Sequence, residues 1–323
     1  MPAVSTLTLR PDASGIACAA RLLAEGGTVA LPTETVYGLA ANARDGAAVA
    51  RIYQAKGRPS FNPLIVHCAD MAAAARIGRL EGEAEALARA FWPGPLTLVV
   101  PLRADAGIAG IVTAGLDSVG LRVPAHPLAQ AVLRASGLAL AMPSANASGR
   151  ISPTTAAHVL DPDGGLAGRI DAVLDGGACP VGIESTIVGW RDGAAVLLRP
   201  GGIAPEDLES VLGHPLARPA EGKTNGEAAP DSPGQLLSHY APAAPVRLNA
   251  QAARAGETLI GFGPIAGDLT LSGSGDLAEA AARLFDVLRE ADRRGRPIAV
   301  APIPAQGLGL AINDRLSRAA APR

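Results

Sequence analysis

The chain has 323 residues, of which 48% are hydrophobic and 18% are charged, and its formal net charge is −2. This composition is typical of a globular protein with a sizeable core, and it argues against binding of nucleic acid over the whole surface, which usually needs a basic excess. Aromatic residues make up only 3% of the chain, so few side chains could stack on the bases of a single strand.

The cysteines and the apolar runs limit the class of protein further. Cys18, Cys68 and Cys179 are far apart and form no Cys-x-x-Cys pair, which predicts neither a zinc site nor a disulfide framework. No apolar run is long enough to span a bilayer, and the first twelve residues lack the features of a signal peptide. We therefore expect a cytoplasmic protein with no membrane segment and no metal held by its own side chains.

Helix and strand signals alternate over the first two-thirds of the chain. Amphipathic spacing, caps and glycine stops predict helices over residues 15–25, 45–55, 83–91, 126–135, 154–160 and 205–212. Apolar runs predict strands over residues 28–33, 63–68, 96–102, 119–124, 138–143, 171–177, 185–190 and 194–200. The Asp-Gly pair at 192–193 predicts a hairpin between the last two strands.

The character of the sequence changes after residue 213. Residues 214–245 are rich in Pro, Gly, Asn and Ser, which is typical of a linker. Beyond it, predicted strands over residues 245–249, 258–263 and 297–303 alternate with a helix over 277–292 and a last helix near Asn313. We expect an α/β domain over residues 1–213, a linker or gate over 214–245 and a small α/β domain over 246–323.

A nucleotide site would have to be built without the usual glycine loops, because the chain has neither a Walker loop nor a Gly-x-Gly-x-x-Gly motif. Three loops at strand ends, LPTET, MPSAN and GIEST, instead carry hydroxyls, amides and carboxylates. In α/β sheets ligands bind at such ends. Taken singly, each loop is explained as well by helix caps or turns.

The stretch KGRPSFNPLIVH carries the strongest signal for an anion. Lys56 and Arg58 flank a glycine and could clamp a polyphosphate, although a solvated helix end explains the same pair about as well. Arg122 lies inside the apolar run VGLRVP, so it either faces solvent or binds an anion. His67, taken alone, is more typical of a structural histidine. No nucleophile is indicated, and hydroxyls, amides and cations that orient and neutralise suit adenylyl transfer.

Taken together and in order, these segments resemble a known family. The segments are LPTETVYGLA, KGRPSFNPLIVH, FWPGPLTLVV, VGLRVP, MPSANASG, GIESTIV, LLRPG and SPGQLLSHYAP. The chain thereby resembles the threonylcarbamoyl-AMP synthases of the YrdC-like superfamily, closely over residues 14–213 and, through the linker tyrosine and the last domain, in their long two-domain form.

The resemblance implies a fold and a reaction. The fold is a twisted, open, mixed α/β sheet that encloses a large concave cavity, followed by a small Rossmann-like domain. The reaction condenses L-threonine, bicarbonate or carbon dioxide and ATP into threonylcarbamoyl-AMP and pyrophosphate. Mg²⁺ would accompany ATP, and the product would pass to the complex that transfers the threonylcarbamoyl group to tRNA, with at most a weak contact to tRNA itself.

The resemblance also implies roles for individual residues. Lys56 and Arg58 match the family's catalytic Lys-x-Arg pair, which faces the phosphates. Positions that match threonine contacts are Thr35, His67, Arg122, Met142 through its backbone, and Ser185. Positions that match ATP contacts, besides the Lys-x-Arg pair, are Asn62, Ser118, Ser144, Asn146, Ser152, Arg199 and Tyr240. Gln235 departs from the residue expected in the linker and affects only the packing of the gate.

Three other interpretations remain. The cavity could bind double-stranded RNA or tRNA, although the net charge and scarce aromatics argue against this. The chain could be a carbamoyl-adenylate enzyme like the related domain of hydrogenase-maturation proteins, but it lacks their zinc fingers and has no room for their additional domains. Finally, the loops could be merely caps and turns, which would leave their coincidence at strand ends unexplained.

Overall fold

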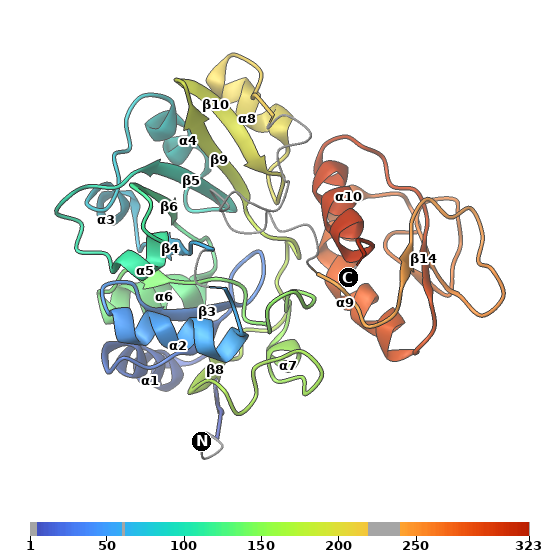
Figure 1. The fold of residues 1–323 in the computed structure, drawn as a ribbon, viewed down its shortest axis with the longest axis horizontal. Helices are drawn as coiled ribbons and strands as arrows, with labels where there is room; N and C mark the ends of the chain where they lie inside the picture. The colour runs from blue at the N-terminus through green and yellow to red at the C-terminus, as the bar shows by residue number, and fades with distance from the viewer. Residues whose placement is uncertain (1–4, 60–61, 219–239, 323) are drawn as a thin grey trace.

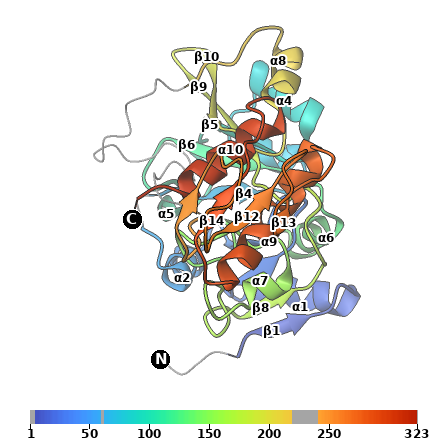
Figure 2. The ribbon, with the colours of Figure 1, turned by 90° about the vertical axis from the view of Figure 1, so that its right-hand side faces the viewer.

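The computed structural model describes residues 5–59, 62–218 and 240–322. Figure 1 shows a large part built on a ten-stranded sheet and a small part built on a four-stranded sheet, with helices α9 and α10 on the side of the small part that faces the large one. Figure 2, turned by 90°, shows the small part in front of the large one. Most of the predicted linker, residues 219–239, lies outside the described residues.

The large sheet is mixed, as predicted. Its strands follow the order β1-β8-β2-β3-β7-β4-β6-β5-β9-β10, and the sheet contains both parallel pairs, such as β4 with β6, and antiparallel pairs, such as β5 with β6. The strands are β1 (Leu7–Leu9), β2 (Val29–Leu31), β3 (Gly38–Asn42), β4 (Ile65–His67), β5 (Leu96–Pro101), β6 (Ser118–Arg122), β7 (Leu140–Ala141), β8 (Ala172–Leu174), β9 (Thr186–Arg191) and β10 (Ala194–Arg199).

Helices cover this sheet, and their ends follow local capping. The helices are α1 (Ala13–Ala24), α2 (Gly46–Lys56), α3 (Met71–Ala75), α4 (Glu83–Phe91), α5 (Gly110–Thr113), α6 (Pro127–Ser136), α7 (Ala156–Val159) and α8 (Pro205–Leu212). Asp45 caps α2 by accepting from the amides of Ala47 and Ala48, and Gly57 ends it in the left-handed region at φ 60°. Because α2 stops there, the chain turns and carries Arg58 back toward the sheet.

The hairpin predicted at the Asp-Gly pair is present. Strands β9 and β10 are antiparallel, and Ala194 pairs with Arg191. Asp192 and Gly193 both have positive φ, 51° and 80°, as the two central residues of a type I′ turn require.

The small domain has the parallel sheet expected of a Rossmann-like unit. Its order is β11-β14-β12-β13, and every neighbouring pair is parallel. The elements are β11 (Val246–Arg247), β12 (Thr258–Gly261), β13 (Leu269–Thr270), α9 (Leu277–Arg293), β14 (Ile298–Val300) and α10 (Leu308–Ala319).

The apolar core of the small domain extends into the large domain. Val36, Ile151 and Ile183 belong to the same buried cluster as the apolar residues of α9 and α10. These three residues lie in three different loops of the large domain, the same loops that carry the polar strand-end motifs. The small domain therefore docks on the loops that are expected to form the site.

Candidate active site

The strand-end loops of the large domain meet around one cavity. Its lining comes from the loop after β2, the β4 strand, the end of β6, the loops after β7 and before β9, the end of β10 and the segment that enters the small domain. The lining residues are Thr33, Thr35, Val36, Gly38, Arg58, Ile65, His67, Arg122, Met142, Pro143, Ser144, Glu184, Ser185, Arg199 and Tyr240.

The loop after β2 is held by its own hydroxyl. The Thr33 hydroxyl accepts from the amides of Thr35 and Val36, at 3.1 and 3.2 Å, and lies 2.8 Å from the Thr35 hydroxyl. Thr33 therefore caps a turn rather than a helix, since β3 follows it. This turn presents Thr35 to the cavity.

Arg122 at the end of β6 is buried and paired. Its guanidinium donates to the Glu34 carboxylate at 2.6 Å and to the carbonyl of Gly94 at 3.3 Å. Burial by itself raises the pKa of Glu34, but the charge and hydrogen bonds of Arg122, with an amide hydrogen bond from Ala125, lower it below its ordinary value. Arg122 thus lines the cavity without adding net charge to it.

His67 lies beside Arg122, its register partner in the parallel pair of β4 and β6. Its Nδ1 is 3.3 Å from the Ile65 carbonyl. Burial, and then the charge of Arg122, lower the pKa of His67 well below its ordinary value. The ring is therefore neutral at physiological pH and can act as a hydrogen-bonding group but not as a cation.

Arg58 reaches the cavity, whereas Lys56 lies behind its wall. The guanidinium of Arg58 donates to the carbonyls of Asn62 and Pro63, and burial lowers its pKa to about 10, so it stays charged at neutral pH. Lys56 is 3% exposed, and its ammonium donates to the carbonyls of Ser144 and Asn146, at 2.6 and 2.5 Å. Burial lowers the pKa of Lys56 well below its ordinary value.

A second arginine holds the loop before β9. Arg199 donates to the Ser185 carbonyl at 2.8 Å and to the Ser185 hydroxyl at 3.1 Å, and that hydroxyl lies 2.8 Å from the hydroxyl of Thr97. Burial lowers the pKa of Arg199 to about 10. A Cβ on Gly201 would lie 2.4 Å from backbone atoms of this loop, so only glycine permits the close approach.

The structure brings most of the predicted site residues to the cavity. Those that line it are Thr35, Arg58, His67, Arg122, Met142, Ser144, Ser185, Arg199 and Tyr240. Lys56, Asn62, Asn146 and Ser152 are buried and do not line it. Asn62 and Asn146 each have a buried Oδ1 with no hydrogen-bond partner among the described residues.

Ser118 lies apart from the other predicted residues. It starts β6 opposite Pro101 and borders a different hollow with Trp190 and Leu198. The contact with ATP predicted for Ser118 therefore has no counterpart in the lining of the main cavity.

Two family models match the chain and identify its family. A family model described as "Telomere recombination", which covers Sua5, YciO and YrdC proteins, matches residues 21–201, and a model described as "Threonylcarbamoyl-AMP synthase, C-terminal domain" matches residues 203–321. The chain belongs to the Sua5/YciO/YrdC family. Its match to the second model places it among the two-domain members.

Relatives of this family cover nearly the whole chain. A threonylcarbamoyl-AMP synthase of Bacillus subtilis is 44% identical over 95% of this chain and 93% of its own length, and one of Pyrococcus abyssi is 40% identical over 94% and 93%. The crystal structure of P. abyssi Sua5 complexed with L-threonine superposes with a TM-score of 0.87, at 38% identity, over 98% of this chain and 97% of that one. Escherichia coli YciO, at 22% identity and a TM-score of 0.53, shares the fold.

Motif matching did not single out Glu34, Glu184 or Arg315 as site residues. Glu34 and Glu184 stand inside the quoted motifs, but nothing local indicates that each lies against a distant arginine. Arg315 lies in α10 of the small domain, 131 residues from Glu184. Only a contact between the domains could reveal it.

The described residues do not form a metal cage of their own. Among them, no group of three or more His, Cys, Asp and Glu side chains could hold a metal ion. Glu184, which lines the cavity, and Glu34, which lies beside the lining residue Arg122, are each engaged by an arginine. The His, Cys, Asp and Glu side chains of the described residues therefore do not fit a resident Mg²⁺ ion.

Proposed function

We propose that this chain synthesises L-threonylcarbamoyl-adenylate from L-threonine, bicarbonate or carbon dioxide and ATP, for the threonylcarbamoyl modification of tRNA. The observation that carries the proposal is the convergence of the strand-end loops on one cavity, in a chain that superposes over nearly its full length on a relative bound to L-threonine. The reaction needs positioning and neutralisation of charge, and the lining provides hydroxyls and cations for both.

The charges at the cavity suit a polyanion. Arg122 is neutralised by Glu34, whereas the hydrogen bonds of Arg58 go to carbonyls. Arg58 can therefore turn its positive charge toward phosphate oxygens, and Arg199 provides a second guanidinium in the lining. We assign the phosphates of ATP to this side, with Ser144 and Tyr240 beside them.

We place threonine against Thr35, His67, Arg122, Ser185 and the backbone of Met142, with Ser185 next to Arg199 of the phosphate side. The neutral amine of threonine adds to carbon dioxide, forms the new N–C bond of a carbamate and releases one proton to water. A carbamate oxygen then attacks the α-phosphorus, the bond from that phosphorus to the bridging oxygen breaks, and pyrophosphate leaves. Neutral His67 and the hydroxyls of Thr35 and Ser185 orient the nucleophile, and the guanidiniums neutralise charge that develops on the phosphates.

Mg²⁺ is proposed to arrive with ATP, held by phosphate oxygens and water, because the described side chains do not fit a cage for it.

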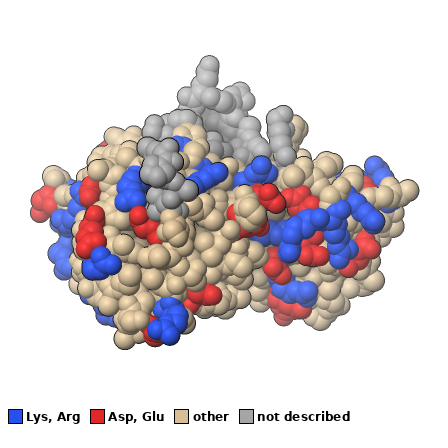
Figure 3. All heavy atoms as spheres, turned by 90° about the horizontal axis from the view of Figure 1, so that it is seen from below, with Lys and Arg blue, Asp and Glu red and all other residues tan. Residues whose placement is uncertain are grey.

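No helix among the described residues could cross a membrane, and we propose that the protein acts in the cytoplasm. On the face drawn in Figure 3, acidic and basic side chains intermingle over both domains, so this face offers no broad basic surface for tRNA. The product would pass to a separate transferase complex.

The test is pyrophosphate release by the purified full chain with ATP, Mg²⁺ and bicarbonate. We expect release with L-threonine and little with L-serine or with no amino acid, together with formation of threonylcarbamoyl-AMP. Release that ignores threonine or bicarbonate would contradict the proposal. Binding of ATP without any release would favour a nucleotide-binding or RNA-binding protein instead.

A further inference from the structure

The small domain contributes one charged side chain to the wall of the cavity. Arg315, on α10, is fully buried, and its Nε donates to the Glu184 carboxylate at 2.9 Å. Its Nη1 donates to the carbonyl of Pro200 at 2.7 Å, also in the large domain, and to the adjacent Asp314 carboxylate at 2.7 Å. Arg315 thus joins two segments of the large domain from outside it.

Glu184 transmits this contact to the nucleotide side of the cavity. Its second carboxylate oxygen accepts from the Ser152 hydroxyl at 2.5 Å, and Glu184 itself lines the cavity next to Ser185. The Glu184 carbonyl also accepts from the amide of Gly202. The contacts run in order from Arg315 through Glu184 to Ser152, so a displacement of the guanidinium would reach a residue matched to ATP binding.

Arg315 also contacts the aromatic residue at the entrance to the small domain. Its guanidinium carbon lies 5.5 Å from the centre of the Tyr240 ring, and Phe285 of α9 stacks on the same ring at a centroid distance of 5.5 Å. Tyr240 lines the cavity, and Ala241 donates to the carbonyl of Gly149 in the loop after β7. The same arginine therefore touches both a carboxylate and an aromatic ring of the lining.

We propose that Arg315 is a positioning residue of the synthase site: from the small domain it holds Glu184 in the cavity wall and, through Glu184, Ser152 behind that wall. The proposal rests on the proposed function. It gives the small domain a task in the chemistry beyond covering the site. A threonylcarbamoyl-AMP synthase of Halorhodospira halophila matches over 49% of this chain and 81% of its own length, so relatives of that name can lack a counterpart of the small domain.

The charges around Glu184 make the proposal testable by pH. The groups that interact with it are Arg315 on α10, which also bonds Asp314, Arg199 at the end of β10, and the Tyr240 phenol. Burial raises the pKa of Glu184, but Arg315, and then Arg199, lower it below its ordinary value. Without Arg315, burial would be opposed only by Arg199 and the remaining hydrogen bonds, so the pKa of Glu184 would rise relative to wild type.

The decisive variant is Arg315→Met, measured by pyrophosphate release between about pH 6 and pH 9. We expect kcat/KM to fall about tenfold or more at neutral pH and to recover partly as the pH rises, because Glu184 regains its charge. Arg315→Lys keeps a cation and should restore the wild-type pH profile at a reduced rate. The double variant Glu184→Gln, Arg315→Met should lose the added pH dependence, because no titrating carboxyl remains at position 184.

Arg289→Met is the matched control. Arg289 is also a buried arginine of the small domain that bonds the large one, through the carbonyl of Ile151 and the Asp161 carboxylate, and it lies on a different helix from Arg315. This variant should weaken docking without adding a titration of Glu184 to the pH profile, because Arg289 is not among the charges that act on that carboxylate. Parallel profiles for Arg315→Met and wild type, or equal effects of Arg315→Met and Arg289→Met, would overturn the proposal.

A second readout separates this proposal from the proposed function. If the wild-type chain released no pyrophosphate, the function would fail, and the role of Arg315 would still be read from stability. In Arg315→Met the folded chain would keep the proton on Glu184 up to a higher pH than wild type does, so the free energy of unfolding of the variant should fall relative to wild type as the pH rises from the wild-type to the variant pKa of Glu184. An unchanged slope would exclude the link between the two residues.

Discussion

Arg122 on β6 and Glu34 in the loop after β2 form a buried ion pair at 2.6 Å, although 88 residues separate them in the chain. The pair fixes the part of the cavity to which we assign threonine, because Glu34 also accepts from the amide of Ala125 at 3.1 Å. Two segments that approach the cavity from different strands are thereby held in one geometry.

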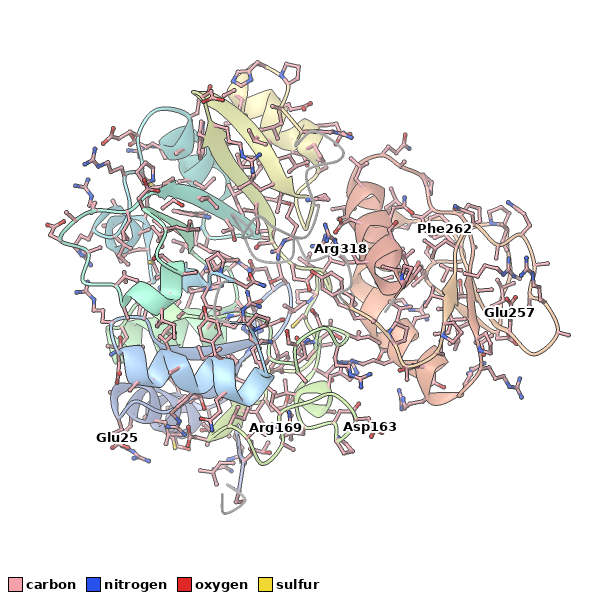
Figure 4. All side chains as sticks on the ribbon, viewed as in Figure 1. Glu25, Asp163, Arg169, Glu257, Phe262 and Arg318 are labelled. Atoms are coloured by element: carbon pink, nitrogen blue, oxygen red, sulfur yellow. The ribbon has the colours of Figure 1, made fainter. Side chains whose placement is uncertain are left out.

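Glu34→Gln should destabilise the fold. Arg122 would remain buried without its counter-charge, and breaking such a pair costs about 3 kcal/mol or more in free energy of unfolding. Urea denaturation would measure the loss. Glu25→Gln is the matched control, because Glu25 pairs with Arg21 on the surface of α1, at the edge of the molecule in Figure 4, and should cost less than about 1 kcal/mol. Equal losses would contradict the assigned role of the buried pair.

The same pair predicts how stability responds to acid. The folded pKa of Glu34 lies below its unfolded value, so its contribution is fully present above about pH 4.3 and is lost as the pH falls through the lower, folded value. The difference in free energy of unfolding between wild type and Glu34→Gln should therefore be constant near neutrality and shrink on acidification. A difference that grows as the pH falls would contradict the lowered pKa of Glu34.

Arg58→Ala should abolish turnover while the fold persists. Its guanidinium donates to two carbonyls of its own loop, so its loss should lower the free energy of unfolding by about 1 to 2 kcal/mol and leave the fold intact. Loss of a cation at the phosphates should cost about a hundredfold or more in kcat/KM. Pyrophosphate release and circular dichroism would be measured together. Arg79→Ala, at an exposed arginine, should leave both unchanged. Normal turnover by a folded Arg58→Ala protein would refute the assignment.

Lys56→Met should affect stability as well as activity. The ammonium satisfies two carbonyls of the Ser144 to Asn146 loop, and leaving them unbonded would cost roughly 2 kcal/mol. The free energy of unfolding and the KM for ATP would be compared with those of Arg58→Ala. If Lys56→Met kept wild-type stability and lost only activity, the lysine would be a direct phosphate ligand and not a support for this loop.

Tyr240 can be tested with two substitutions. Phe at this position keeps the stacking on Phe285 and the contact with Arg315, whereas Ala removes both. We expect the Phe variant to stay within about threefold of wild type and the Ala variant to release pyrophosphate with a lower yield of threonylcarbamoyl-AMP, because water reaches the labile anhydride. Equal yields from both variants would show that the ring does not exclude water.

Local signals were sufficient for the elements with clear periodicity. Helix α4 begins and ends at the predicted residues 83 and 91, and α8 at 205 and 212. Strand β3 was missed, because GLAAN offers small residues in place of the β-branched run that predicts a strand. Short elements such as β1 and α5 likewise lack enough residues to show a period.

The site was predictable where chemistry is local and not where it depends on distant partners. Thr35, Arg58 and Ser185 stand in motifs at strand ends, and the cavity forms there. Nothing in the sequence around Lys56 indicates that its ammonium would donate to carbonyls 88 and 90 residues away. Arg315 is typical of the charges on an amphipathic helix, and its partner Glu184 belongs to another domain.

Figure 4 labels Arg318, which lies about one turn beyond Arg315 on α10, on the side of the small domain that faces the large one. The two domains share an apolar cluster across this boundary, through Val36, Ile151 and Ile183. Truncation of this chain after α8 would expose the side chains of all three residues to water. The shortened protein would then carry an exposed apolar patch beside the cavity, which would promote aggregation. The two domains should accordingly melt in a single cooperative transition, and a form truncated after α8 would need new polar residues at these three positions to stay dispersed in solution.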